Sequence, residues 1–151
     1  MNPLILTIYQ PQSELMEKLY GDPHGLFESL ANRKMYHPEQ FDEKGMLDMR
    51  AWAPVFDLDI SNDPFFAFVR NAYRSCNNPQ AFMSLYALFN QQLLVMTRRY
   101  GYLGRTMSVG DVIAFKTDVP RFYYCDNYDW KVIAPVNIHD AAKLKMSIVN
   151  V

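Results

Sequence analysis

The sequence predicts a single α+β domain, residues 1–151, in which a small antiparallel sheet carries helices on one face. Two observations predict the sheet: a dense β-type run at Leu4–Tyr9, and a series of short, strongly punctuated strands between Arg105 and Ile133. A third observation predicts the helices, because apolar residues between Pro64 and Tyr100 recur at helical spacing. We expect the C-terminal strands to form a meander that the N-terminal strand joins.

Composition restricts the class of protein. Half of the chain is hydrophobic and 15% is aromatic, so 151 residues can bury a substantial core. The formal net charge of −1 provides no global field for nucleic acid or for an anionic membrane. Two cysteines, Cys76 and Cys125, are too few for a secreted disulfide scaffold. The sequence has no basic-then-apolar leader and no run long enough to span a membrane, so we expect a cytoplasmic protein.

Beyond its first strand, the N-terminal part predicts two short helices, a loop and a second strand. Apolar spacing predicts the helices at Ser13–Tyr20 and Pro23–Met35. His37–Leu47 is polar and turn-rich, which is typical of a solvated loop. Val55–Ile60 alternates like a half-buried strand, and Pro54 before it indicates a sheet edge or a strand start.

Two longer helices are predicted in the middle of the chain. Asp63 is an N-cap candidate for a helix over Pro64–Cys76, whose first residue is a proline. The longest helix covers Gln80–Tyr100 and ends at Gly101. Outside its main apolar stripe it carries three further apolar residues: Leu88, Leu94 and Val95. Because a sheet covers only one side of a helix, we expect this helix to contribute to a homodimer or to a surface that binds a partner.

The C-terminal part predicts three strands, at Val112–Phe115, Phe122–Asp126 and Trp130–Ile133. Each is rich in β-branched or aromatic residues, and turn-forming residues separate them. We expect one buried cluster across this meander, formed by Val112, Phe115, Trp130 and Val132. Met146–Val151 predicts a last strand at the sheet edge.

Side chains that could carry chemistry are scattered. The three histidines are His24, His37 and His139. Their spacing suits no metal, with or without the cysteines, so we expect no metal site, no cofactor and no catalytic residue of a known motif. Cys125 with His139 would make a nucleophile pair, but a cysteine in an aromatic strand more commonly serves packing. Three carboxylates could pair for acid–base chemistry, although their alternation is typical of the solvent face of a strand: Asp57, Asp59 and Asp63.

One local cluster interleaves positive charge with aromatic rings. Its members are Arg98, Arg99, Tyr100, Tyr102 and Arg105. Arginine can pair with phosphate and tyrosine can stack on an unpaired base, so the cluster is a candidate nucleic-acid site. The competing interpretation is a helix C-terminus whose cations complement the helix dipole, with the tyrosines packed on the sheet. The absence of a matching basic face elsewhere in the sequence favours the second interpretation.

The stretch that follows carries a motif. Arg105–Ile113 reads RTMSVGDVI, a polar loop leads to YYCD at Tyr123–Asp126, and Trp130 closes the pattern. This pattern resembles the YodL-like small-protein family, whose mostly uncharacterised members are common on plasmids, phages and conjugative elements. Thr106 stands where that family usually has serine. The motif positions that we treat as candidate site residues are Ser108, Gly110, Asp111, Tyr124, Asp126 and Trp130.

Three classes of function are compatible with the sequence. The resemblance implies a non-enzymatic accessory protein of a mobile genetic element that binds another protein, and inhibition of a host defence complex is one concrete form of that role. The aromatic and methionine content suits a contact surface. The alternative is a nucleic-acid-binding module that uses the cluster between Arg98 and Arg105. An enzyme with an unfamiliar site is the third class.

Overall fold

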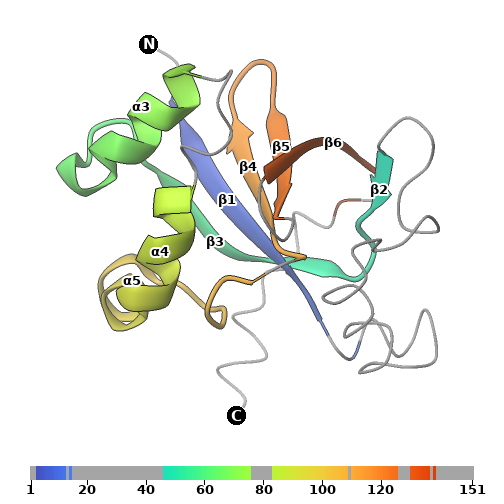
Figure 1. Ribbon diagram of the computed structural model, residues 1–151, viewed down its shortest axis with the longest axis horizontal. Helices are drawn as coiled ribbons and strands as arrows, with labels where there is room; N and C mark the ends of the chain where they lie inside the picture. Colours follow the sequence, from blue (N-terminus) through green and yellow to red (C-terminus); the bar gives the residue numbers. More distant parts are fainter. Residues whose placement is uncertain are drawn as a thin grey trace.

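The computed structural model places a six-stranded sheet at the centre of the chain and a layer of helices against one of its faces (Figure 1). It describes residues 3–12, 14, 46–75, 83–108, 110–125, 130–136 and 138. The predicted class, α+β with helices on one face of a sheet, is confirmed. The elements predicted at Ser13–Tyr20, Pro23–Met35 and Met146–Val151 lie outside the described residues, apart from Glu14.

Five strands of the sheet are antiparallel, and one edge strand is parallel to its neighbour. In chain order the strands are β1 Ile5–Pro11, β2 Met46–Asp48, β3 Trp52–Asp59, β4 Val112–Lys116, β5 Arg121–Cys125 and β6 Trp130–Val136. Their spatial order is β2-β6-β5-β4-β1-β3. The last three strands form the predicted meander, and β1 pairs with β4 on one side and with β3 on the other.

The sequence does not predict β2, whose residues fall at the end of the polar stretch His37–Leu47. This strand pairs in parallel with the last residues of β6. Only Met49–Ala51 separates it from β3, which lies at the opposite end of the strand order. A flat sheet of six strands is about 24 Å wide, whereas four Cα steps cover at most about 15 Å. The sheet must therefore curl until its two edges approach each other.

The edge position of β3 explains its proline. Pro54 pairs with Tyr9 of β1, and a proline is tolerated on an edge strand because no second neighbour requires its missing N–H. A bulge between Ile8 and Tyr9 shifts the register at this point. The edge that Pro54 predicts is thus confirmed.

A 3₁₀ turn and three α-helices form the helical layer: η1 Pro64–Phe66, α3 Ala67–Ser75, α4 Met83–Gln91 and α5 Leu93–Tyr100. The predicted N-cap is confirmed, because Asp63 Oδ1 accepts the backbone N–H of Phe65 at 2.9 Å. The predicted end at Gly101 is also confirmed. This glycine has a φ of 71°, the left-handed conformation that commonly ends helices.

The prediction of one continuous helix over Gln80–Tyr100 is wrong. The helix is interrupted at Gln92, whose φ of −114° and ψ of 30° are not helical, and α5 there leaves the direction of α4 (Figure 1). The bend lets apolar residues of both halves reach the interior, so Leu88 is buried and Val95 is half-buried. Of the three surplus apolar residues, Leu94 alone stays mostly exposed, at 60%.

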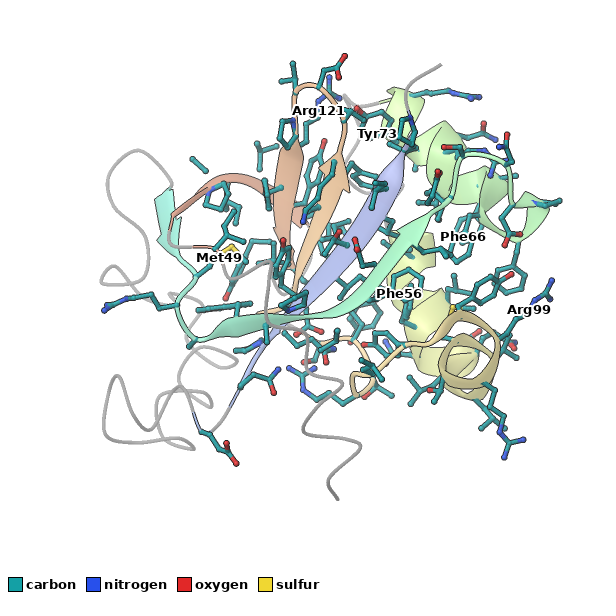
Figure 2. All side chains as sticks on the ribbon, turned by 180° about the vertical axis from the view of Figure 1, so that it is seen from behind. Met49, Phe56, Phe66, Tyr73, Arg99 and Arg121 are labelled. Atoms are coloured by element: carbon teal, nitrogen blue, oxygen red, sulfur yellow. The ribbon has the colours of Figure 1, made fainter. Side chains whose placement is uncertain are left out.

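The main core lies between the sheet and the helices and is rich in aromatic rings. Phe56 of β3 has three ring neighbours: Phe66 at a centroid distance of 6.3 Å, Phe89 at 5.3 Å and Tyr102 at 6.1 Å. Phe56 and Phe66 are labelled in Figure 2. Along β4, Ile113 and Phe115 belong to this core. Side chains alternate along a strand, so Val112 and Ala114 lie on the opposite face, where both are also buried.

The predicted cluster of Val112, Phe115, Trp130 and Val132 is wrong in two members. Val112 faces away from the main core, and Val132 is 70% exposed. Val132 pairs with Tyr123, a core residue, so it lies on the helical side of the sheet. Its exposure means that the described helices do not extend over β6 at this position.

Trp130 and Val132 provide a matched pair on one strand. Trp130 is 2% exposed and belongs to the main core, so Trp130→Ala should lower the free energy of unfolding by about 3–5 kcal/mol. Val132→Ala should change it by less than about 0.5 kcal/mol. Urea unfolding followed by circular dichroism measures both, and equal stabilities of the two variants would contradict this placement of Trp130.

Candidate functional site

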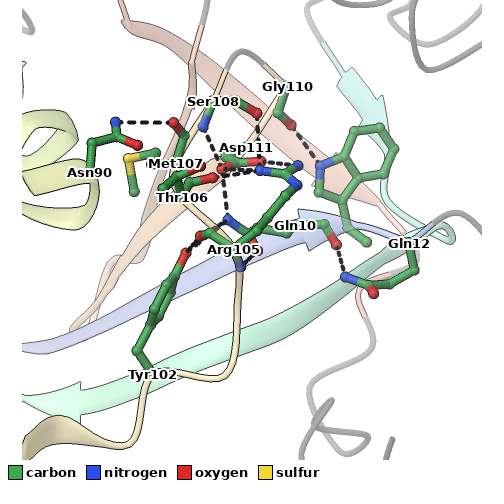
Figure 3. Close-up of polar contacts among 11 residues, drawn as sticks. Gln10, Gln12, Asn90, Tyr102, Arg105, Thr106, Met107, Ser108, Gly110 and Asp111 are labelled. Carbon is green, nitrogen blue, oxygen red and sulfur yellow. Dashed lines mark hydrogen bonds and ion pairs between the residues drawn. The ribbon is translucent and has the colours of Figure 1, made fainter. Parts of the chain in front are cut away.

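The family-like motif begins with a loop that folds back on its own aspartate (Figure 3). Asp111 is completely buried, and its backbone N–H donates to the Ser108 carbonyl at 3.1 Å. In return, the N–H of Ser108 donates to Asp111 Oδ2 at 2.9 Å. These two bonds close the turn, so the serine and the aspartate of the motif determine the shape of the loop.

Arg105 compensates the charge of this buried carboxylate. Its Nη2 lies 3.0 Å from Asp111 Oδ1 and its Nη1 lies 3.2 Å from Oδ2, so the pairing is two-pronged. Nη1 also donates to the Thr106 carbonyl at 2.8 Å and to Ser108 Oγ at 3.0 Å. Although the side chain reaches the surface, its guanidinium is therefore held by the loop.

Strand β1 supplies the third component, Gln10. Its Nε2 donates to Asp111 Oδ2 at 2.9 Å and lies 2.8 Å from the Tyr102 hydroxyl. Its Oε1 accepts the backbone N–H of Arg105 at 3.1 Å, while the Tyr102 hydroxyl donates to the Arg105 carbonyl. We call Gln10, Tyr102, Arg105 and Asp111 the latch, because together they join the loop at the start of the motif to strand β1 of the sheet.

Two glycines make the latch sterically possible. A side chain at Gly104 would overlap Gln10 Oε1 and the Tyr102 hydroxyl. Gly110 has a φ of 101°, which residues with a side chain rarely adopt. Its carbonyl accepts the indole N–H of Trp52 at 2.8 Å, so this turn also holds the first residue of β3.

Burial and ion pairing oppose each other at Asp111. Burial raises the pKa of its carboxyl to about 6, and the charge and hydrogen bonds of Arg105 only partly offset that rise. Burial, assisted by the charge of Asp111, also raises the pKa of Tyr102. At neutral pH the carboxylate is ionised, and both of its oxygens accept hydrogen bonds from the protein. The role of the latch that these contacts indicate is to stabilise the folded loop.

The predicted Arg/Tyr cluster divides into two groups. Tyr102 and Arg105 belong to the latch, and the buried Tyr102 cannot stack on a base. Arg98 and Arg99 are exposed in the last turn of α5. The guanidinium of Arg99 lies 5.2 Å from the ring centroid of the half-buried Tyr100. Of the five residues, Arg98 and Arg99 remain available to a ligand.

Arg98 lies on the same side of α5 as Leu94, which precedes it by one helical turn. Arg99 is five positions from Leu94, about 140° around the helix axis, and is exposed on a neighbouring side. Thr97, which is also exposed on α5, carries no charge. Figure 2 shows Arg99 extending outward, away from the sheet. We call Leu94, Arg98 and Arg99 the α5 surface.

The helical layer differs in charge from the rest of the chain. Between Asp63 and Asp111 the sequence has five arginines and no aspartate, glutamate, lysine or histidine. This segment carries +5, so the remaining residues carry −6 in a chain of net −1. Arg70 donates to two backbone carbonyls, and Arg105 belongs to the latch. The other three arginines are exposed: Arg74, Arg98 and Arg99. Counting charge by segment would have found this asymmetry in the sequence.

The other described motif residues lie on the strands that follow the latch loop. Tyr124 and Trp130 are buried in β5 and β6. Cys125 is also buried, and its backbone N–H donates to the Asp111 carbonyl at 2.8 Å. Asp126 lies outside the described residues.

The three predicted carboxylates interact with nearby polar groups. Asp57 accepts the Thr7 hydroxyl at 2.7 Å. Hydrogen bonds from Ser61 hold the pKa of Asp59 below its usual value. Asp63 is the N-cap described above. Within the described residues no three metal-binding side chains lie together, and all three histidines fall outside those residues.

Comparisons of the chain with models of protein families, with curated proteins and with solved structures give no match. The resemblance to the YodL-like family therefore stays a prediction. In the segments that the structure describes, no helix is long and apolar enough to cross a membrane.

Asp111→Asn tests the latch at neutral pH. The new amide N–H₂ would face donors on Arg105, Gln10 and Ser108, and the guanidinium would lose its counter-charge. We expect the free energy of unfolding to fall by about 3–5 kcal/mol. Asp118→Asn, the same exchange at an exposed loop residue, should change it by less than about 0.5 kcal/mol. Chemical denaturation at pH 7 compares the two, and indistinguishable midpoints would refute the latch.

The titration of Asp111 gives the latch a pH dependence. Its pKa rises from 3.8 to about 6 on folding, so between these values the folded protein binds the proton more readily than the unfolded chain. The resulting stabilisation is complete below about pH 4 and is lost as the pH rises through about 6, a change of up to about 3 kcal/mol. The Asp111 carboxyl resonance should titrate near pH 6 in NMR. A midpoint at or below 3.8 would show that Arg105 outweighs burial.

Proposed function

We propose that this chain is a non-enzymatic protein that acts by binding another protein through the α5 surface. The observation that carries the proposal is the exposure of Leu94 beside Arg98 and Arg99. Among the described residues neither arginine has a carboxylate partner. The surface thus combines an apolar centre with charged groups at its margin, as binding surfaces commonly do.

The composition of the helical layer supports a protein partner. Arginine and aromatic residues are enriched in the cores of protein interfaces, whereas lysine, aspartate and glutamate are depleted. Residues 64–110 follow this pattern, with five arginines and none of the three depleted types.

We further propose that the chain is an accessory protein of a mobile genetic element and that its binding inhibits a host defence complex. This part rests on the resemblance of Arg105–Ile113 and Tyr123–Asp126 to YodL-like proteins. The latch supports a shared scaffold, because it explains why a chain with this fold needs Arg105, Gly110 and Asp111.

A nucleic-acid-binding module is the second candidate function. Exposed Arg98 and Arg99 favour it, because guanidinium groups pair well with phosphate. The latch, however, engages Arg105 and buries Tyr102, which removes one predicted phosphate contact and one stacking ring. Leu94 also has no role in phosphate binding, so a protein partner accounts for more of the surface.

Exchange of Leu94 tests protein binding. Tagged wild-type, Leu94→Asp and Val119→Asp chains capture proteins from an extract of the cells that naturally produce this chain. We expect one partner with wild type, and at least about tenfold less of it with Leu94→Asp, because the interface would bury an unpaired charge. Val119→Asp is the matched control, since Val119 is 72% exposed in the β4–β5 loop, and it should retain the partner. Equal recovery by all three chains would rule out the α5 surface.

Two further measurements separate the alternatives. If the partner is a second copy, light scattering should give a mass above 17.6 kDa that Leu94→Asp lowers. If the ligand is nucleic acid, fluorescence anisotropy with labelled RNA or DNA should show binding that Arg98→Ala and Arg99→Ala weaken. Each lost phosphate contact then lowers the salt slope by about one.

A further inference from the structure

We propose that the partner presents an acidic surface to α5: an apolar side chain that covers Leu94, flanked by carboxylates that pair with Arg98 and Arg99. This inference rests on the proposed protein-binding function and specifies the chemistry that the partner must have. It follows from the spacing of Leu94 and Arg98, from the stacking of the Arg99 guanidinium and from the charge of the helical layer.

The spacing places the apolar and cationic groups together. Leu94 and Arg98 are four positions apart on α5, so their side chains lie on the same side of the helix. Thr97, also exposed on α5, is uncharged, and neither α4 nor α5 contains an acidic residue. A partner that covers Leu94 must bring its neighbouring groups within reach of Arg98, where a carboxylate meets no repulsion from these two helices.

Arg99 is oriented by two aromatic rings. Its guanidinium carbon lies 5.2 Å from the Tyr100 centroid and 6.0 Å from the Phe65 centroid, and the two rings are 5.6 Å apart. Stacking restricts the side chain but leaves N–H groups at the edge of the guanidinium, and this edge matches the two oxygens of a carboxylate. The outward direction of Arg99 in Figure 2 makes that edge accessible to a partner.

The positive charge of the helical layer favours a partner surface with negative charge. Of the five arginines in residues 64–110, Arg70 and Arg105 are engaged within the chain, while Arg74, Arg98 and Arg99 are exposed. Arg98 and Arg99, the two exposed arginines on α5, attract an acidic surface and repel a positive one, whereas Arg74 lies on α3. A symmetric dimer through α5 would bring the same arginines of two copies together, so the charge disfavours a second copy as the occupant.

The same surface favours protein carboxylates over nucleic-acid phosphates. The exposed Leu94 needs an apolar partner atom, which a phosphodiester backbone lacks. Base stacking would need an available ring near Arg98, but Tyr102 is buried in the latch, and Tyr100 is half-buried with the Arg99 guanidinium beside its ring. Lysine, which also binds phosphate well, is absent from residues 64–110.

The test uses fluorescence anisotropy with two synthetic peptides. The acidic peptide has about 18 residues, with leucines at helical spacing and glutamates between them, and the neutral peptide has glutamine at each glutamate position. We expect the wild-type chain to bind the acidic peptide with a Kd below about 100 µM and the neutral one at least about tenfold more weakly. Raising the salt concentration should weaken the acidic complex, because salt screens exposed charges.

Variants locate the binding. Arg98→Glu, Arg99→Glu and Leu94→Asp should each weaken the acidic peptide by about tenfold. Arg74→Glu is the matched control: it makes the same charge change on α3 and should leave the affinity within about twofold. A third peptide, with lysine at each glutamate position, should bind the Arg98→Glu, Arg99→Glu double variant in preference to wild type.

Equal affinity for the acidic and neutral peptides, or no binding up to about 1 mM, would overturn the inference. Tighter binding of a single strand of about 12 nucleotides, with the same dependence on Arg98 and Arg99, would overturn it in favour of nucleic acid. The capture experiment distinguishes this failure from failure of the proposed function. A natural partner that Leu94→Asp loses but that Arg98→Glu and Arg99→Glu retain would uphold protein binding and refute the acidic surface.

Discussion

The completely buried carboxylate of Asp111 is the interaction on which the rest of the structure depends. A charge in a protein interior is unfavourable unless it is paired and hydrogen-bonded. One partner of Asp111, Arg105, belongs to the same loop. Another, Gln10, comes from the distant N-terminal strand β1. Because α5 ends at Gly101, directly before this loop, the latch also sets where α5 meets the sheet. The exposed α5 surface is thus positioned by a network that faces inward.

Local patterns predict most of the described elements, because alternation, caps and turn residues are properties of neighbouring residues. The wrong predictions arise where the structure depends on contacts between residues that are distant in the sequence. β2 has three residues and gains its pairing from β6, much later in the chain. The helix is interrupted at Gln92 although the helical spacing of apolar residues continues through it. The bend follows from the packing of α4 and α5 on the core, which the spacing does not show. Val132 is an apolar residue in a strand pattern that predicts burial. It is exposed because the described helices do not extend over it.

The candidate site is predictable in its residues but not in its arrangement. All five members of the Arg/Tyr cluster stand out in the sequence. Tyr102 and Arg105 turn inward because both hydrogen-bond to Gln10. The spacing of the cluster along the chain does not show this contact. Gly110 and Asp111 attract attention as motif residues, and the fold itself requires both. The positive charge of the helical layer is visible in the sequence, but the exposure of Arg98 and Arg99 follows from the structure.

The position of β1 between β3 and β4 gives the chain a particular order of assembly during synthesis. β1 precedes the other described strands in the chain, yet one of its edges pairs with β3 and the other with β4, which begins at Val112. Until β4 emerges, the nascent chain carries a strand whose β4 edge is unpaired, and such edges recruit strands from other chains. Closing so long a loop also costs conformational entropy before pairing stabilises the product. The pairing of β1 is therefore completed only after Val112 has been synthesised, and a chain that ends before Val112 leaves the β4 edge of β1 without its strand partner.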